Sequence, residues 1–322
     1  MTMRFDSFLG PLLEEYVDYR QNLGYSMEPT RGYLQQFDRY VKAIKRKPGK
    51  LKPLFFLKMR SDLKMEPRSA NRIIASSRVF FQYLVRRGIY CDNPVKDVPY
   101  LSEWALIPFI LSESETDRLL EAATGRMRRD QMYFLKDFSQ YMSIVLMARC
   151  GLRISETIRL RRHQYRADEK TLYIEKTKFK KDRLIPAPSK IWREMDNYLT
   201  VRDALASADN PFLLAGLFER SLCDDKIRTM FRLAVNDIGL DQPRQRIGNT
   251  IISSPTPHSL RHSFAVNTLK RVKERGLSPQ NALPILAVYM GHSEYKHTTK
   301  YLKLADADHH RRITHFMANK VI

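Results

Sequence analysis

The sequence of 322 residues has few cysteines, and the three that it has, Cys91, Cys150 and Cys223, lie far apart. They form no CxxC pair, which argues against a zinc ribbon and a disulfide framework and favours a reducing cytoplasm. No run approaches the ~18 consecutive apolar residues of a membrane-spanning helix. The N-terminal stretch holds acidic residues early and lacks the apolar core of a signal peptide. We therefore expect a soluble cytoplasmic protein.

Acidic residues are scarce as well, because 35 Asp and Glu stand against 56 Lys and Arg, a net charge of +21. This excess favours a polyanionic partner, with nucleic acid ahead of a membrane surface. The alternative that the protein is basic but has no such partner stays open. The 43% apolar content, with 16 Phe and 16 Tyr, supplies hydrophobic cores and argues against global disorder. The length suits two domains.

The first 98 residues are expected to form a small helical bundle. Apolar residues recur at helical spacing over 5–20 and 29–44. A segment rich in lysine and proline follows, which we interpret as a loop. A further helix then runs from Ser69, as its capping residue, to Gly88.

Prolines separate this bundle from the rest of the chain. The stretch that follows the bundle contains Pro94, Pro99 and Pro108, and these prolines prevent it from forming a helix. We therefore expect a linker over 99–110. Residues 111–322 are expected to form a second domain that is mainly α-helical with a small antiparallel β-sheet.

Local patterns place several elements of the second domain. Ser112, followed three residues on by Glu115, predicts a capping box at a helix start. The run 142–148 is apolar on nearly every side, as in a helix buried at a domain centre, and Gly151 can end that helix. The segment 240–257 has no motif that we can use and is interpreted as a loop.

A change to alternating apolar residues predicts a β-hairpin over 171–186. Its turn carries four lysines: Lys176, Lys178, Lys180 and Lys181. A lysine run on an exposed turn is usually a solvated tip, and a catalytic lysine is the alternative.

Two further motifs hold polar residues of interest. In "GLRISE", Arg153 follows the turn at Gly151, and an arginine beside Glu156 is by itself most simply a surface ion pair. In "YMGHSEYKHTTKYLKL", Tyr301 follows His292 by nine residues. This second stretch could be an ordinary helical surface.

A third motif, "PTPHSLRHSFA", begins with Pro257, which suits the first position of a helix. His258 and Arg261 are three residues apart and share one face of the first turn, where a helix N-terminus can bind an anion. His262 points about a quarter-turn away from Arg261, and we interpret it as structural. The Glu of HExxH is absent, since Ser259 follows His258, so no metal site is expected.

These motifs, in this order, resemble the tyrosine recombinase/phage integrase family, which includes the Xer recombinases and lambda integrase. The matching stretches are "GLRISE", the lysine hairpin ending in "KKDRLIP", "HSLRHSFA" and "GHS…KY". The resemblance covers roughly 110–310. It implies an α-rich catalytic domain, preceded by a helical core-binding domain that clamps DNA and that the N-terminal half resembles only weakly.

The resemblance assigns a role to each matched residue. Arg153 and Arg261 would clamp the phosphate, His292 would add a hydrogen bond, and Glu156 would support the site. His258 is the candidate acceptor of the nucleophile's proton, because histidine titrates near neutrality. Tyr301 would be the nucleophile. Lys178 corresponds to the hairpin lysine, but Thr177 and Phe179 replace the usual flanking glycines, so Lys176 or Lys180 stay open. Tyr289 and Tyr295 lack the matching spacing and are interpreted as packing or surface groups.

The implied activity is site-specific cutting and rejoining of duplex DNA through a covalent 3′-phosphotyrosyl link, without a metal ion or other cofactor. The task would be integration, excision or transposition of a mobile element, with chromosome or plasmid dimer resolution as an alternative by the same chemistry. A type IB topoisomerase and a non-enzymatic DNA-binding regulator on the same scaffold also stay open.

The resemblance also implies partners: double-stranded DNA with specific sites, a homotetramer on that DNA, and accessory or partner proteins, at the nucleoid and without a membrane. Arg72 and Arg78 lie on the last predicted helix of the N-terminal domain and either contact DNA phosphates or belong to a solvated basic surface. The residues after Tyr301 would pack on a neighbouring subunit or on their own domain.

Overall fold

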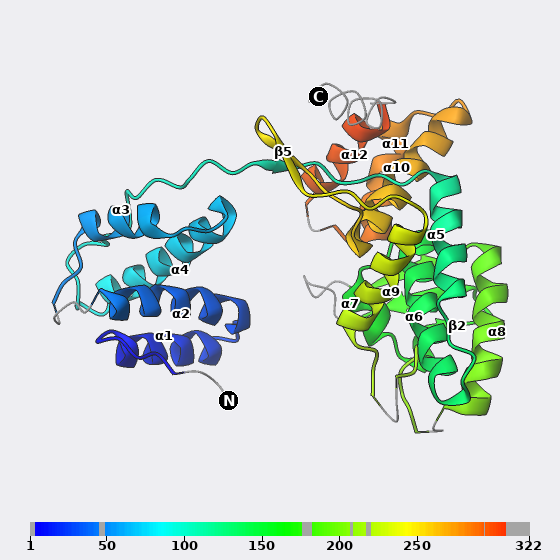
Figure 1. Ribbon diagram of the computed structural model, residues 1–322, viewed down its shortest axis with the longest axis horizontal. Helices are drawn as coiled ribbons and strands as arrows, with labels where there is room; N and C mark the ends of the chain where they lie inside the picture. Colours follow the sequence, from blue (N-terminus) through cyan, green and yellow to red (C-terminus); the bar gives the residue numbers. More distant parts are fainter. Residues whose placement is uncertain are drawn as a thin grey trace. The chain divides into compact units, whose positions relative to one another are not determined.

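The computed structural model describes residues 4–44, 49–175, 182–206, 209–216, 220–292 and 294–306 (Figure 1). The chain divides into two compact units, Met1–Ala105 and Leu106–Ile322, each with a hydrophobic core of its own. The boundary falls within the segment that prolines mark as a linker. In the described parts of the chain, no helix is long and apolar enough to cross a membrane.

The first unit consists of helices with a shared aromatic core. They are α1 (Gly10–Asn22), α2 (Glu28–Ala43), α3 (Pro53–Asp62) and α4 (Pro67–Arg86). The rings of Phe37, Phe56 and Phe81 pack against one another with centroids 5.2–6.0 Å apart, and all three side chains are fully buried. The expected helical bundle is confirmed.

Two local predictions in this unit are wrong. The lysine- and proline-rich segment contains α3, because Pro53 suits a helix start and Phe55 and Phe56 bury their rings in the core. Ser69 does not cap α4, which begins two residues earlier at Pro67 and has no side-chain cap. In both places a proline stands in the first turn of the helix, where it needs no N–H partner.

The end of the first unit is held to α4 by side-chain hydrogen bonds. Asn71 donates to the carbonyl of Leu101 at 2.9 Å and accepts from the Leu101 N–H at 2.8 Å, so it pairs with both backbone groups of that residue. Arg78 donates to the carbonyls of Val95 and Val98 and to the hydroxyl of Tyr100.

The second unit is built around α6 (Gln131–Cys150), whose side chains from Met142 to Ala148 are all buried, as predicted. The helices packed on it are α5 (Glu113–Gly125), α7 (Ile154–Arg159), α8 (Ser189–Leu205), α9 (Asp224–Asp237) and α10 (Pro257–Glu274). The capping box of Ser112 and Glu115 at the start of α5 is confirmed.

Helix α10 also belongs to a second cluster, with α11 (Pro279–Met290) and α12 (Lys296–Asp306), which lie together in Figure 1. Their shared core includes Val266, Leu283 and the ring of Tyr301. Since α10 packs on α6 with one face and on α12 with another, it joins the centre of the unit to the tyrosine.

Two small sheets complete the unit, and the pairs β2–β3, β3–β4 and β5–β6 are antiparallel. The predicted hairpin is confirmed as β3 (Thr171–Ile174) and β4 (Arg183–Pro186), which β2 (Tyr165–Arg166) extends after the short helix η1 (Arg162–Gln164). The loop predicted at 240–257 is wrong, because this segment holds β5 (Gln245–Ile247) and β6 (Thr250–Ile252), beside β1 (Ala105–Leu106). Gly248 and Asn249 between the strands are a hairpin signal that we overlooked.

Replacing Asn71 by Ala should detach the residues around Leu101 from α4, because both backbone groups of Leu101 lose their partner. We expect a loss of about 1–3 kcal/mol in the free energy of unfolding. Hydrogen exchange should show faster exchange of the Leu101 amide. An Asp at position 71 keeps an acceptor for the Leu101 N–H and should protect that amide better than Ala. Unchanged exchange in the Ala variant would contradict this account.

Candidate active site

Arg153 is placed by the end of α6. Gly151 follows the helix with φ +62°, and a Cβ there would lie 2.5 Å from the Phe264 ring, so glycine suits both the backbone and the space. The chain turns, and Arg153 precedes α7 as its N-cap. Its guanidinium donates to Glu156 at 2.8 Å and to the carbonyl of Gly291 at 3.3 Å, which brings the "GLR" and "GHS" motifs together.

Glu156 is the buried anion of the site. Besides Arg153, it accepts two hydrogen bonds from Arg183, at 2.8 and 3.0 Å, and lies 3.9 Å from Arg261. Burial alone would raise the pKa of Glu156, but Arg183, the backbone N–H of Arg153 and the charge of Arg261 lower that pKa to about 2. The carboxylate is therefore charged at neutral pH.

Arg261 is almost fully buried, at 1% exposure, on α10. Its guanidinium donates to the carbonyl of Gly151 at 2.6 Å and to the carbonyl of Met290. Burial and the nearby Arg153 lower the pKa of Arg261 to about 9, which still leaves it charged at neutral pH. Two arginines far apart in the sequence thus lie around one carboxylate.

Arg183 is a member of this group that the sequence analysis missed. It begins β4 with 8% exposure and also donates to the carbonyl of Tyr289 at 2.9 Å. The signal was present, because Ile185 faces the core and residues two apart on a strand share a face. Gly291, with φ +62°, lies against this guanidinium, which a Cβ would approach to 2.9 Å.

Tyr301 lies on α12 with 4% exposure, and its hydroxyl oxygen is 3.0 Å from Nδ1 of His262. Burial raises the pKa of Tyr301, while the charges of Arg261 and Arg153 act against that rise. The interpretation of His262 as only structural overlooked this contact, because α10 and α12 meet through tertiary packing.

The other two histidines flank this pair. The His292 ring stacks beside Tyr301 at 6.1 Å between centroids, and its Nδ1 lies 2.7 Å from the hydroxyl of Thr298. Desolvation, Arg261 and Arg153 lower the pKa of His292 to about 3. His258, in the first turn of α10, is partly exposed and packs edge-on against His262 at 4.4 Å.

The other predicted residues are a hairpin lysine, two arginines of the first unit and two tyrosines. Lys178, with Lys176 and Lys180, lies outside the described residues. Arg72 is exposed on α4, whereas Arg78 donates to backbone carbonyls, and the DNA contacts of both stay predictions. Tyr289 stacks on Phe264 and Tyr295 is half exposed, which agrees with their interpretation as packing or surface groups.

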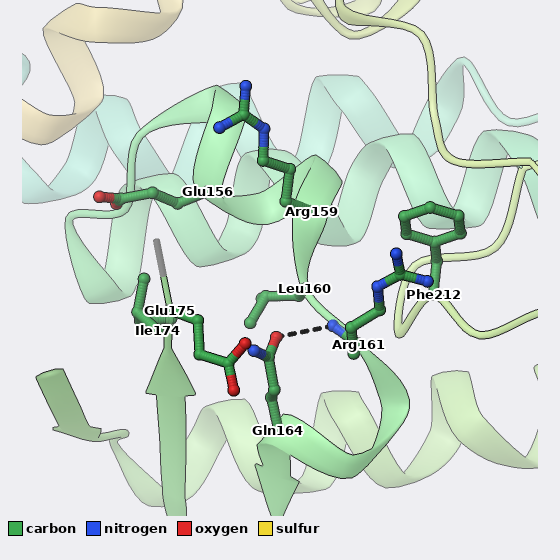
Figure 2. Close-up of a pocket in the computed structure, with 8 residues that line it drawn as sticks. All are labelled: Glu156, Arg159, Leu160, Arg161, Gln164, Ile174, Glu175 and Phe212. Atoms are coloured by element: carbon green, nitrogen blue, oxygen red, sulfur yellow. Dashed lines mark hydrogen bonds between the residues drawn. The ribbon is translucent and has the colours of Figure 1, made fainter. Parts of the chain in front are cut away.

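A pocket of about 290 Å³ opens beside Glu156, between α7, η1 and the end of β3 (Figure 2). At one side of it Arg161 extends towards Phe212, with its guanidinium 4.4 Å from the centroid of the Phe212 ring. Glu156 is shared with the arginine cluster, but Tyr301 does not line the pocket. The pocket is therefore a neighbour of the site and not its reaction centre.

Replacing Glu156 by Gln should destabilise the fold at pH 7 by roughly 3 kcal/mol, because buried guanidiniums lose their anion. The carboxyl has its pKa lowered from 4.5 to about 2, so its contribution is present above pH 4.5 and is lost as pH falls towards 2. Urea unfolding from pH 7 to 3.5 should show the gap between wild type and variant closing. Glu169→Gln, which breaks an exposed pair with Arg166, is the control; an equal effect of both would contradict the assignment.

Comparison with known proteins agrees with this geometry. The phage integrase family matches residues 110–308. The protein y4rE of Sinorhizobium fredii, named as an integrase/recombinase, is 30% identical over 92% of this chain and 92% of its own. A tyrosine recombinase of Pseudothermotoga lettingae is 28% identical over 76% of this chain and 73% of its own.

The fold is also that of a solved structure. A lambda integrase dimer bound to a COC' core site matches with a TM-score of 0.63 at 17% identity, over 89% of this chain and 96% of that one. The resemblance seen in the sequence motifs is thus confirmed over residues 110–308. The chain belongs to the phage integrase family of tyrosine recombinases.

Proposed function

We propose that this protein is a site-specific DNA recombinase that cuts and rejoins duplex DNA through Tyr301. The observation that carries the proposal is that the buried ring of Tyr301 lies beside the ring of His292. Arg153 and Arg261 donate to the carbonyls of Gly291 and Met290, the two residues just before His292. A tyrosine beside paired guanidiniums suits attack on a phosphodiester, because their charge stabilises the anion that develops at phosphorus.

The arginines would bind the scissile phosphate. Guanidiniums are planar and are charged at neutral pH, and they match pairs of phosphate oxygens. Arg261 is fixed by two carbonyls and Arg153 by Glu156 and Gly291, so both are held before DNA arrives. Nδ1 of His292 hydrogen-bonds with the hydroxyl of Thr298. Nε2 is therefore the nitrogen that would donate to a phosphate oxygen.

The cleavage step exchanges one ester for another. Tyr301 Oη gives its proton to a neighbouring histidine and forms a bond to phosphorus. The bond to the 5′ oxygen breaks, and the 3′ phosphate remains on the tyrosine. Lys178, by family resemblance, would protonate the 5′ oxygen. The phosphotyrosyl bond keeps the energy of the phosphodiester, so a 5′ hydroxyl from a second strand can reverse the step.

The substrate would be double-stranded DNA carrying specific recombination sites, which the net charge of +21 suits. Recombination joins two duplexes with two breaks each, so we propose a homotetramer on DNA. The lambda integrase match is itself a dimer on a core site. Such an enzyme would act at the nucleoid in the cytoplasm.

For the biological task we propose integration and excision of a mobile element, because the relative y4rE, which matches over nearly the whole chain, is named as an integrase/recombinase. Dimer resolution would use the same chemistry on a different site. Screening both the DNA flanking the gene and a genomic fragment library separates the two tasks by the sequence that reacts.

Replacing Tyr301 by Phe should abolish covalent attachment to DNA while leaving DNA binding intact, because only the hydroxyl is lost. The measurement is a denaturing gel of protein mixed with nicked duplexes from the library, in the presence of a chelator. Tyr295→Phe, on an exposed tyrosine nearby in sequence, is the matched control and should form adduct normally.

An adduct that survives in Tyr301→Phe would show that another residue attacks phosphorus. Wild-type protein that binds the whole library but forms no adduct would contradict the enzymatic proposal. That result would favour a DNA-binding regulator.

Replacing Arg72 by Ala should weaken DNA binding uniformly across sequences if this exposed residue contacts a phosphate. Each lost contact lowers the slope of log K against log salt by about 0.9. Titrations from low to moderate salt measure that slope. Arg72→Lys keeps the charge and should keep the slope, whereas an unchanged slope in the Ala variant would remove Arg72 from the interface.

A further inference from the structure

His262 makes a contact that the proposed function does not use. It lies one turn after His258 on α10, so the two histidines share a helix face, and that face meets α12. Nδ1 of His262 is 3.0 Å from the Tyr301 hydroxyl oxygen, a hydrogen-bond distance. In the described parts of the chain, no other side chain hydrogen-bonds this hydroxyl.

The surroundings of His262 keep its ring neutral. Desolvation is the largest cause that lowers the pKa of His262, to about 3, and His258, Arg261, His292 and Lys300 add to it. A neutral imidazole with its proton on Nε2 has a lone pair on Nδ1. That lone pair can accept the hydrogen of the Tyr301 hydroxyl.

We propose that His262 is a catalytic residue that accepts the proton of Tyr301 when the tyrosine attacks DNA. The inference rests on the proposed role of Tyr301 as nucleophile. As the bond from Oη to phosphorus forms, the proton passes from Oη to Nδ1 of His262, and the bond to the 5′ oxygen breaks. That oxygen takes its proton from a separate acid. In rejoining, His262 returns its proton to the tyrosine.

Geometry favours His262 over His258, the residue that we expected from the sequence to accept this proton. His258 is partly exposed and touches the ring of His262, whereas His262 touches the reacting oxygen itself. A general base must lie within about 2.6–3.2 Å of the proton-bearing atom that it serves. His258 would then lie beside the imidazolium of His262 and would not contact the reacting oxygen.

The arrangement would also tie proton transfer to DNA. Without DNA, burial and nearby groups that include Arg261 oppose a positive charge on His262. A phosphate bound by Arg261 would bring negative charge close to His262, which favours the imidazolium. The phenol would therefore stay protonated until the scissile phosphate is in place.

Two substrates separate this role from that of the leaving-group acid. One is a nicked duplex with an ordinary phosphodiester, and the other has sulfur in place of the bridging 5′ oxygen. A thiolate leaves without a proton, so the sulfur substrate restores variants that lack the acid. It cannot restore a variant that lacks the base for Tyr301.

We expect His262→Ala to cleave both substrates about 100-fold or more slowly than wild type, while DNA affinity and melting temperature stay close to wild type. His262→Asn keeps a hydrogen-bonding group near the position of Nδ1 but cannot accept a proton. It should also remain at least about tenfold slow. His163→Ala, on an exposed histidine of η1, is the matched control and should cleave like wild type.

Three results would overturn the assignment: cleavage by His262→Ala within about threefold of wild type, recovery on the sulfur substrate, or recovery in His262→Asn, which would make His262 a positioning residue. Should the Ala variant fail to bind DNA, the Asn variant decides. If the wild-type protein forms an adduct that requires Tyr301, the proposed function holds whatever the His262 variants show. If the wild-type protein forms no adduct, both the proposed function and the role of His262 are overturned.

Discussion

The buried carboxylate of Glu156 holds together side chains that the chain delivers from three separate elements. Arg153 comes from the turn before α7, Arg183 from β4 and Arg261 from α10, and all three are within 4 Å of it. Three guanidiniums so close would repel one another and lose hydration without an anion between them. The carboxylate offsets part of this charge and leaves a net positive site for phosphate.

The same interactions tie backbone to side chains. Arg261 and Arg183 donate to carbonyls at the end of α11, and Arg153 donates to Gly291 just after it. The loop that carries His292 is therefore attached to the arginine cluster, and His292 in turn contacts Thr298 at the start of α12. Tyr301 is placed through this series of contacts and through its own ring in the α10–α12 core.

The sequence predicted much of the fold where a pattern lies within one element. The apolar run of α6, the capping box of Ser112 and the hairpin of β3 and β4 need only neighbours along the chain. Prediction from the sequence failed where a residue type that is common in loops also occurs at the start of a helix or in the turn of a hairpin. Pro53 begins a helix that proline content had argued against, and β5 and β6 are joined by a Gly-Asn turn in a segment that we interpreted as a loop.

For the site, the sequence by itself determined the candidate residues, since motif order and spacing singled out Arg153, Arg261, His292 and Tyr301. Only the tertiary structure decided that Arg183 completes the cluster around Glu156 and that His262 touches Tyr301. Helical and strand periods relate residues within one element. The contact between positions 262 and 301 depends instead on how α10 packs against α12, which burial of their shared apolar core decides.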